Sequence, residues 1–160
     1  MANTSDCIFC QIVAGAAPCH KIWESETHLA FLSIFPNTEG FSVVIPKIHQ
    51  DSYAFAVSDQ VLSDLILATK QVAQLLDSHF NDVARCGMFF EGYGVDHLHA
   101  KLFPMHGTKS EDGRWQSIES THNNQFFKLY PGYLSSNNSD RADDAKLAAL
   151  ATAIRETAKK

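Results

Sequence analysis

Two histidines and a lysine alternate with apolar residues in the sequence GVDHLHAKLFPMHG. If residues 96–103 form a β-strand, His97, His99 and Lys101 share one face of it, and the apolar residues between them take the other. Two imidazoles and an ammonium in one row are suited to binding phosphate or zinc. The same alternation is typical of a half-buried strand whose polar side faces solvent, and the short His-x-His spacing alone favours that simpler interpretation.

A second group of chemically capable residues opens the chain. Cys7 and Cys10 form a Cys-x-x-Cys pair at the start of the segment CIFCQIVAGAAP. In a reducing cytosol a close cysteine pair binds metal or does redox work more often than it forms a disulfide. Two thiols with apolar neighbours can also be ordinary core residues, so the pair by itself leaves both interpretations open.

The composition limits the partners of this protein. The 160 residues include 45% hydrophobic and 19% charged side chains, a balance typical of one globular domain. The formal net charge of -5 offers no general basic field for long nucleic acid, whose binding depends on Lys and Arg. The sequence has no apolar run approaching the roughly 20 residues that span a bilayer. MANTSDCIFCQIV lacks the features of a signal peptide, so we expect a cytoplasmic protein without a membrane partner.

The order of secondary-structure signals predicts an α+β fold. A short N-terminal helix is expected from Cys7, a hairpin from HKIWES and THLAFLSI, and a strand buried on both faces from FSVVIP. Ser58 opens a long amphipathic helix whose apolar residues recur at spacings of three and four through Leu76. VARCGMFFEG and DHLHAKLFP add two strands. This order indicates an antiparallel β-sheet of about five strands rather than repeated βαβ units.

The chain changes character after Gly107. A polar stretch and the aromatic segment FFKLYPGYL precede SSNNSDRADDAKLAALATAIRETAKK, which predicts a terminal helix. Leu147, Leu150 and Ile154 would face the core or a partner. FFKLYPGYL is too apolar to lie free in water, so we expect it to cover the functional site or a second subunit. Residues 107–160 are thus predicted to be a C-terminal extension packed on the same domain.

Several stretches together resemble the histidine triad (HIT) family. HLHAKLFP is similar to the family's strand motif, in which three histidines alternate with apolar residues. The segment 7–50 is similar to its N-terminal half, because it contains the Cys-x-x-Cys opening of zinc-containing bacterial members, the strand AFLSI and the strand end IPKIH. The resemblance spans residues 7–104, about two-thirds of the chain, and implies that residues 1–106 form a HIT-like nucleotide-binding domain.

The resemblance implies a covalent mechanism. In the family, the middle motif histidine attacks the α-phosphorus of a nucleotide and forms a nucleotidyl-histidine, which makes His99 the expected nucleophile. A neutral imidazole attacks without first losing a proton, provided that an acceptor, commonly a backbone carbonyl, holds its other ring nitrogen. The expected activity is that of a nucleotide hydrolase or nucleotidyl transferase acting on a purine phosphoramidate or dinucleoside polyphosphate.

The same resemblance implies nucleotide-binding residues, some of which depart from the family pattern. Lys101 stands in place of the third motif histidine; an ammonium can hold phosphate but relays a proton poorly, which predicts slower turnover or a different leaving group. Ser33 stands where an aspartate usually grips the ribose, and offers one hydroxyl. Phe31 matches an aromatic that contacts the base. Glu91 and Asp96, although close to the motif, are interpreted as fold or solvent residues.

The resemblance also implies a zinc site. Zinc binds about four nitrogen or sulfur ligands in tetrahedral geometry. A closed set of four protein ligands implies a structural ion that ties the N-terminal helix to the histidine strand, and it removes the first motif histidine from direct catalysis. The ligands implied are Cys7, Cys10, His49 and His97. A homodimer is expected as well.

Two other interpretations remain open. Lys101 and Ser33 could record lost catalysis, which would make the protein a catalytically weak or inactive nucleotide sensor with a structural zinc. Less favoured is a metalloenzyme in which His97 and His99 bind one catalytic ion. His106, shortly after the motif, is one further histidine that could reach the phosphate or supply a proton.

Overall fold

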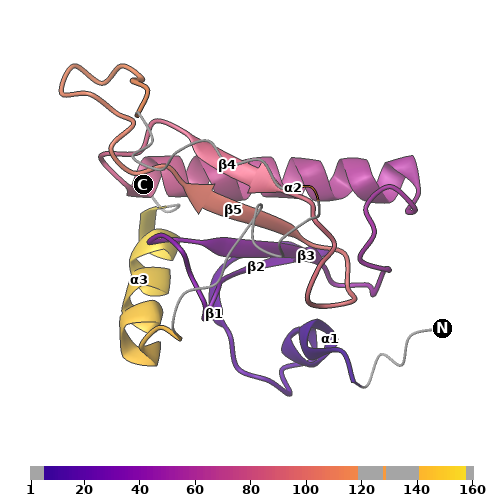
Figure 1. The fold of residues 1–160 in the computed structure, drawn as a ribbon. Helices are drawn as coiled ribbons and strands as arrows, with labels where there is room; N and C mark the ends of the chain where they lie inside the picture. Colours follow the sequence, from indigo (N-terminus) through magenta and orange to yellow (C-terminus); the bar gives the residue numbers. More distant parts are fainter. Residues whose placement is uncertain (1–5, 119–127, 129–140, 158–160) are drawn as a thin grey trace.

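The computed structural model describes residues 6–118, 128 and 141–157, and these residues contain one antiparallel sheet (Figure 1). The strand order is β1-β2-β3-β5-β4, and every pair of neighbours is antiparallel. The strands are β1 (His20–Glu24), β2 (His28–Leu32), β3 (Ser42–Pro46), β4 (Cys86–Phe89) and β5 (Ala100–Pro104). The prediction of an α+β fold with an antiparallel sheet of about five strands is confirmed.

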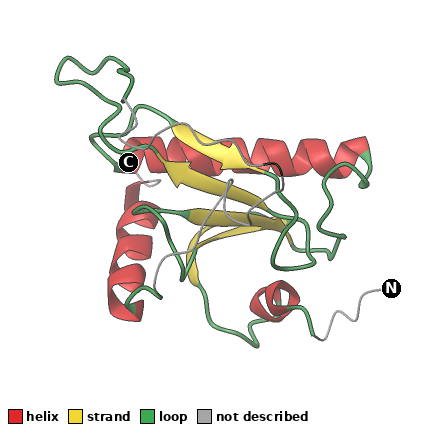
Figure 2. Cartoon of the chain, in the orientation of Figure 1, coloured by secondary structure: helices red, strands yellow, loops and turns green. Residues whose placement is uncertain are grey.

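The described residues also form three helices: α1 (Ile8–Val13), α2 (Asp59–His79) and α3 (Asp144–Thr157). α2 begins where the Ser58 hydroxyl accepts a hydrogen bond from the backbone N–H of Val61, which is the capping signal visible in the sequence. α2 covers one face of the sheet and α1 lies on the other side, while α3 stands against β1 and α2 (Figure 2).

Both faces of the central strands are buried, which divides the core into two parts. Ala30 and Val44 belong to the part that contains the apolar residues of α2 and α3, whereas their neighbours Phe31 and Val43 belong to the part beneath α1. This is the period-two alternation of a strand buried on both faces. Phe31, Val43 and Lys101 pair in register across β2, β3 and β5, so all three lie on the α1 face of the sheet.

The strand predicted over residues 96–103 is wrong at its start, because β5 begins only at Ala100. The pairing of β3 with β5 stops where Val44 faces Ala100. The next residue of β3 whose backbone faces β5 is Pro46, which has no N–H to continue the hydrogen bonds between the two strands. Leu98 instead donates its N–H to the carbonyl of Gln50, with 2.8 Å between N and O.

The two histidine side chains still share one side of the chain, although they precede β5. The ring of Phe9 meets the ring of His97 with 5.7 Å between centroids, and that of His99 with 5.6 Å. Leu98 lies in the opposite part of the core, with Ala100. The alternation expected from the sequence is therefore kept without the ladder hydrogen bonds of a strand.

The predicted terminal helix is present as α3, and its apolar residues face the core rather than a partner. Leu147 and Ile154 are buried there, and Leu150 packs against them. An exposed contact ties the start of α3 to β1, with 2.9 Å between His20 Nε2 and Asp144 Oδ1. The C-terminal helix is thus part of the packing that supports the sheet.

Most of the aromatic segment FFKLYPGYL, residues 126–134, lies outside the described residues. The division of the chain into a domain over 1–106 and an extension over 107–160 stays a prediction. Among the described residues, none of the helices has the length and hydropathy needed to cross a membrane.

Replacement of Ile154 by alanine tests whether α3 is integral to the fold. Ile154 is fully buried against α2 and the sheet, so we expect Ile154→Ala to lower the free energy of unfolding by about 2–5 kcal/mol. Lys146→Ala, at an exposed position of the same helix, should change it by less than about 0.5 kcal/mol. Urea denaturation measures both, and equal values for the two variants would contradict an integral helix.

Candidate functional site

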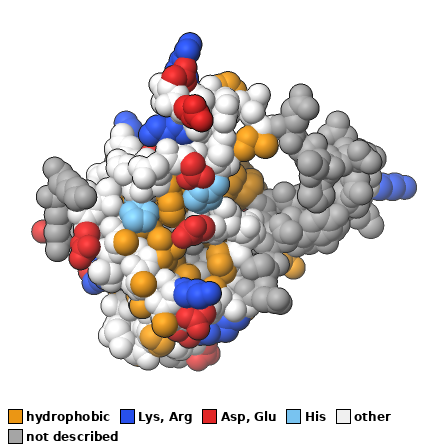
Figure 3. All heavy atoms as spheres, turned by 90° about the vertical axis from the view of Figure 1, so that its left-hand side faces the viewer, with side chains coloured by type: hydrophobic (Ala, Val, Ile, Leu, Met, Phe, Trp, Pro, Cys, Tyr) orange, Lys and Arg blue, Asp and Glu red, His pale blue; other side chains and the backbone are white. Residues whose placement is uncertain are grey.

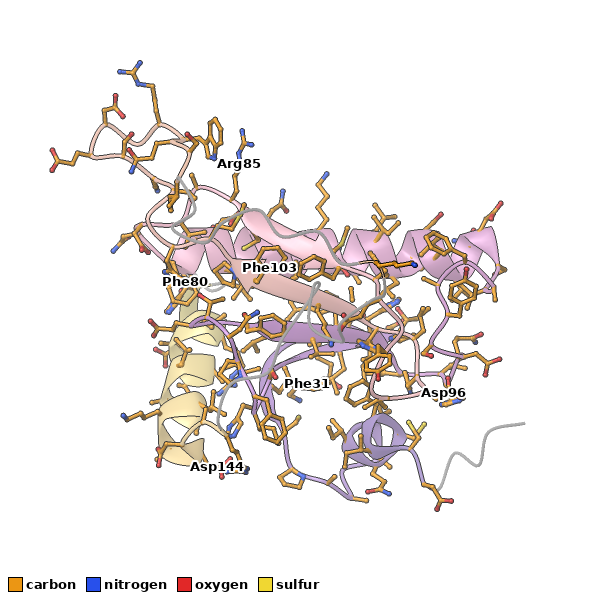
Figure 4. The ribbon with its side chains drawn as sticks, in the orientation of Figure 1. Phe31, Phe80, Arg85, Asp96, Phe103 and Asp144 are labelled. Atoms are coloured by element: carbon orange, nitrogen blue, oxygen red, sulfur yellow. The ribbon has the colours of Figure 1, made fainter. Side chains whose placement is uncertain are left out.

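Five of the residues that the sequence singles out gather at one end of the sheet, on the α1 face: Cys7, Cys10, His49, His97 and His99. α1 supplies two cysteines at its start, the segment after β3 supplies His49, and the segment before β5 supplies His97 and His99. Phe9 of α1 contacts both of the latter rings and also the ring of Phe31, at 5.5 Å between centroids. Figure 4 shows Phe31 between the sheet and α1.

Four of these residues form a compact group of potential metal ligands. The sulfur and ring-nitrogen atoms of Cys7, Cys10, His49 and His97 all lie within 4.8 Å of one another. The Nδ1 atom of His97 lies 3.4 Å from Cys7 Sγ and 3.6 Å from Cys10 Sγ, and His49 Nδ1 lies 3.4 Å from Cys10 Sγ. α1 makes this possible because positions three apart lie on one helix face.

The hydrogen bond of the His97 imidazole fits this ring to a cation. His97 Nε2 donates to the carbonyl oxygen of Pro46 at 2.9 Å, which leaves the Nδ1 lone pair directed at the sulfurs. Burial lowers the pKa of His97, so the ring is neutral as a ligand must be. His49 Nε2 is buried and has no hydrogen-bond partner among the described residues.

The Cys10 thiol needs a positive charge nearby to ionise. Burial, followed by the neighbouring Cys7, raises the pKa of Cys10 to about 11. A divalent cation between the two sulfurs would favour both thiolates. Two sulfurs and two imidazole nitrogens are a donor set that tetrahedral zinc takes in structural sites. The arrangement therefore fits zinc, with all four positions supplied by the protein.

His99 is oriented by a backbone hydrogen bond. Its Nδ1–H donates to the carbonyl oxygen of His97 at 2.7 Å, which is the kind of acceptor that the sequence analysis required without locating it. The lone pair is therefore on Nε2. The ring is 2% exposed, and burial, together with the charge of Lys101, lowers the pKa of His99. A neutral, oriented imidazole of this kind is a competent nucleophile.

Lys101 lies two residues beyond His99 and forms an ion pair with Glu91. Glu91 follows β4, whose last residue Phe89 pairs with Lys101. The side chains of Lys101 and Glu91 are 17% and 11% exposed. The sequence analysis placed Glu91 among fold or solvent residues and missed this pair, because the register of β4 on β5 that makes it cannot be read from either strand alone.

The predicted base and ribose residues have clear structural settings. Phe31 is 5% exposed and packs edge-on against Phe9. Ser33 directly follows β2, and its hydroxyl accepts a hydrogen bond from the N–H of Phe35 at 3.1 Å. Phe31 and Lys101 lie two strands apart on the same face, about 10 Å at the usual strand spacing. Their roles toward a nucleotide stay predictions.

Two other residues near the motif in sequence form hydrogen bonds with residues outside the candidate site. His106 lies beyond the far end of β5, where Nδ1 is 3.1 Å from an Asp82 carboxylate oxygen and Nε2 is 3.1 Å from the Glu39 carbonyl. It is not brought to His99. Asp96 accepts a hydrogen bond from the N–H of Ser52 at 3.0 Å and so ties two loops together, in agreement with its interpretation as a fold residue.

Comparison with known proteins identifies relatives of this chain. The HIT domain family matches residues 14–108. An adenosine 5′-monophosphoramidase of Schizosaccharomyces pombe is 35% identical over 99 residues, covering 61% of this chain and 73% of that protein. An uncharacterized HIT-like protein of Mycoplasma genitalium is 39% identical over 112 residues, covering 66% and 77%.

The fold is also found among solved structures. A zinc-bound histidine triad family protein from Mycobacterium smegmatis has a TM-score of 0.65 to this chain at 20% identity, covering 97% of this chain and 94% of that one. The family match begins at residue 14, so Cys7 and Cys10 lie outside it. Their suitability as metal ligands rests on the geometry of the four side chains.

Removal of one thiol tests the metal site. We expect the purified protein to contain about one zinc ion per chain, and Cys10→Ser to lose it, because three ligands hold zinc far more weakly than four. The unfolding midpoint should fall by roughly 5–10 °C with the ion. Atomic emission measures the metal, and differential scanning calorimetry measures the midpoint.

Cys19→Ser is the matched control, because Cys19 is a free thiol outside the ligand group. It should keep its zinc. A wild-type protein that carries no zinc after expression in zinc-supplemented medium, or a Cys10→Ser variant that retains it, would contradict the assignment.

Proposed function

This chain belongs to the HIT domain family, and on that premise we propose that it is a nucleotide hydrolase or nucleotidyl transferase that acts at the α-phosphate of a purine nucleotide through His99. The observation that carries the proposal is the hydrogen bond from His99 Nδ1 to the His97 carbonyl, which leaves Nε2 as the attacking atom. The relatives include an adenosine 5′-monophosphoramidase, which supports a phosphoramidate as one substrate.

The proposed reaction has two displacements. His99 Nε2 forms a bond to the α-phosphorus while the P–N or P–O bond to the leaving group breaks, and the leaving group departs with a proton taken from solvent. Water then attacks the nucleotidyl-histidine, the P–Nε2 bond breaks, and a nucleoside monophosphate is released with His99 neutral again. Attack by another acceptor in place of water would give a transferase. A dinucleoside polyphosphate would react in the same way.

Binding roles follow the face of the sheet on which His99 lies. Lys101 would hold the phosphate, as the positive side chain nearest to His99 along β5. Phe31, two strands away on that face, would contact the base, and the hydroxyl of Ser33 would bind the ribose. The spacing of about 10 Å between the β2 and β5 positions is suited to a nucleotide lying across β3.

The proposed zinc is structural. Cys7, Cys10, His49 and His97 would hold it, and the ion would fasten α1 to the segment that carries His99. His99 is not a member of the ligand group, and its Nδ1 donates a hydrogen bond to the carbonyl of His97. The geometry therefore does not favour a catalytic ion shared by His97 and His99. Reduced thiols of this kind are maintained in the cytoplasm, where we place the protein.

A small nucleotide rather than long nucleic acid is the proposed partner. Basic and acidic side chains are interspersed on the face drawn in Figure 3, and its described residues form no continuous basic stripe. With a net charge of -5, the chain offers a local phosphate site and not a general field.

One observation favours the alternative of a nucleotide-binding protein with little or no turnover. Lys101 stands in the third motif position and is already paired with Glu91, so residue 101 offers neither an imidazole nor an unopposed cation. The two functions differ in whether a nucleotide that binds is also cleaved.

We further propose that the protein is a homodimer that uses the open edge of the sheet. β4 is the outermost strand, and within the described residues no strand pairs with its outer side. Met88 on β4 is 44% exposed, and Leu67 on α2 is 58% exposed. Unpaired edges with apolar side chains favour association.

Sedimentation equilibrium tests the assembly. The expected mass is twice the 17.7 kDa of the chain. Met88→Arg should weaken the dimer by about tenfold or more, because it places a charge in the proposed interface. Ala149→Arg, at an exposed position of α3 against the opposite edge, is the control and should leave the mass unchanged. A wild type that stays monomeric at 100 times its assay concentration would exclude the dimer.

Turnover of adenosine 5′-phosphoramidate tests the proposed activity. The wild type should release AMP, and His99→Ala should reduce kcat by at least about a thousandfold, because the attacking atom is lost. His106→Ala should keep the rate within about threefold, since His106 lies at the other end of β5. Chromatographic detection of AMP measures the rates.

The outcomes separate the candidate functions. AMP release that survives His99→Ala would exclude His99 as nucleophile. Binding of AMP without cleavage of either the phosphoramidate or diadenosine polyphosphates would establish the nucleotide-binding alternative.

A further inference from the structure

The ion pair between Lys101 and Glu91 lies beside the proposed nucleophile, and it has consequences for which phosphates the site accepts. The inference rests on the proposed function. Both side chains are largely buried, at 17% and 11% exposure; Lys101 lies on β5, and Glu91 lies in the segment that follows β4. Pairing of Phe89 with Lys101 sets Glu91 two residues beyond the lysine's partner, within reach of the ammonium.

The backbone on both sides of Glu91 is fixed. Before it, Phe89 stacks on Phe103 with ring centroids 4.7 Å apart. After it, Gly92 has a φ of 60° and lies so close to Ser52 that a Cβ would be 2.8 Å from the Ser52 carbonyl oxygen. A side chain at residue 92 would push the two loops apart. Glu91 is therefore held in place rather than free to swing into solvent.

The pair leaves almost no net charge next to His99. The Lys101 ammonium and the Glu91 carboxylate carry opposite charges and are in direct contact. An unopposed Lys101 would attract any phosphate in proportion to its negative charge. With Glu91 present, the attraction is largely cancelled, and a highly charged phosphate also meets the carboxylate directly.

Substrates and product of the proposed reaction differ in the charge on the phosphate. An α-phosphate still bonded to its leaving group, as in a phosphoramidate or a dinucleoside polyphosphate, carries one negative charge. A nucleoside monophosphate loses a second proton near pH 6 and carries two charges at pH 8.

We infer that Glu91 is a specificity-determining residue of this site: it holds the Lys101 ammonium and thereby removes the preference for doubly charged phosphate monoesters over singly charged α-phosphates that an unopposed lysine would give. The singly charged phosphate can share the ammonium with Glu91. The doubly charged monophosphate meets the repulsion of the carboxylate twice over, which offsets the doubled attraction of the ammonium, so the product of hydrolysis is not retained as it would be by an unopposed Lys101.

Three adenosine ligands of increasing charge test the inference by isothermal titration at pH 8 and low salt. They are adenosine, adenosine 5′-methylphosphate with one charge, and AMP with two. Glu91→Gln keeps the size of the side chain and removes its charge. We expect it to leave adenosine binding unchanged, to tighten the methyl ester about threefold and to tighten AMP about tenfold. The AMP factor is close to the square of the methyl ester factor because the repulsion scales with ligand charge.

Two further variants separate the effect from altered folding. Glu111→Gln removes the same charge from an exposed loop and should change none of the three affinities. Lys101→Met combined with Glu91→Gln should abolish the gain for AMP, because the cation that Glu91 holds is then absent. Unchanged adenosine binding serves as the check that each variant is folded at the site.

The possible failures are distinguishable. If the wild type binds none of the three ligands, the proposed function fails and this inference falls with it. If the wild type binds them and Glu91→Gln tightens AMP no more than the methyl ester, only the role of Glu91 is overturned, and Glu91 is a structural partner of Lys101.

Discussion

The hydrogen bond from His97 Nε2 to the Pro46 carbonyl, at 2.9 Å, fixes the ring on which both halves of the site depend. Pro46 ends β3 and cannot donate to a further strand, so its carbonyl is available to a side chain. Because Nε2 of His97 donates this hydrogen bond, its Nδ1 faces the sulfur atoms of Cys7 and Cys10. Its own carbonyl then accepts the Nδ1–H of His99 at 2.7 Å. One residue thus connects the end of the sheet, the proposed metal ligands and the orientation of His99.

Burial beneath α1 supplies the electrostatic condition that these hydrogen bonds need. Phe9 covers the rings of both His97 and His99, and with Phe31 it keeps water from that part of the sheet. Burial lowers the pKa of each imidazole, which keeps both rings neutral, as the proposed metal ligand and the proposed nucleophile must be. α1 has only six residues and is too short to be stable alone. Its packing and the ligand group therefore stabilise each other.

The parts of this arrangement that rest on local signals were predictable from the sequence. The Ser58 cap and the apolar spacing after it indicate α2, and FSVVIP indicates a strand buried on both faces. The start of β5 was not predictable, because it depends on a proline in another strand. The pair of Lys101 with Glu91 was not either, because it depends on the register of β4 against β5. The four-residue ligand group was expected only through family resemblance, since no local spacing joins His49 to Cys10.

The departures from the family pattern concern charge, whereas the retained features concern geometry. An imidazole beside the leaving group could serve both as a positive charge and as a carrier of a proton. A lysine paired with a glutamate carries no net charge, and an ammonium does not give up its proton readily. The orientation of His99 does not depend on whether residue 101 is a histidine or a lysine, because the carbonyl of His97 sets it. The imidazole of His99 can therefore keep its orientation while the pair of Lys101 with Glu91 changes the charge that a phosphate would meet.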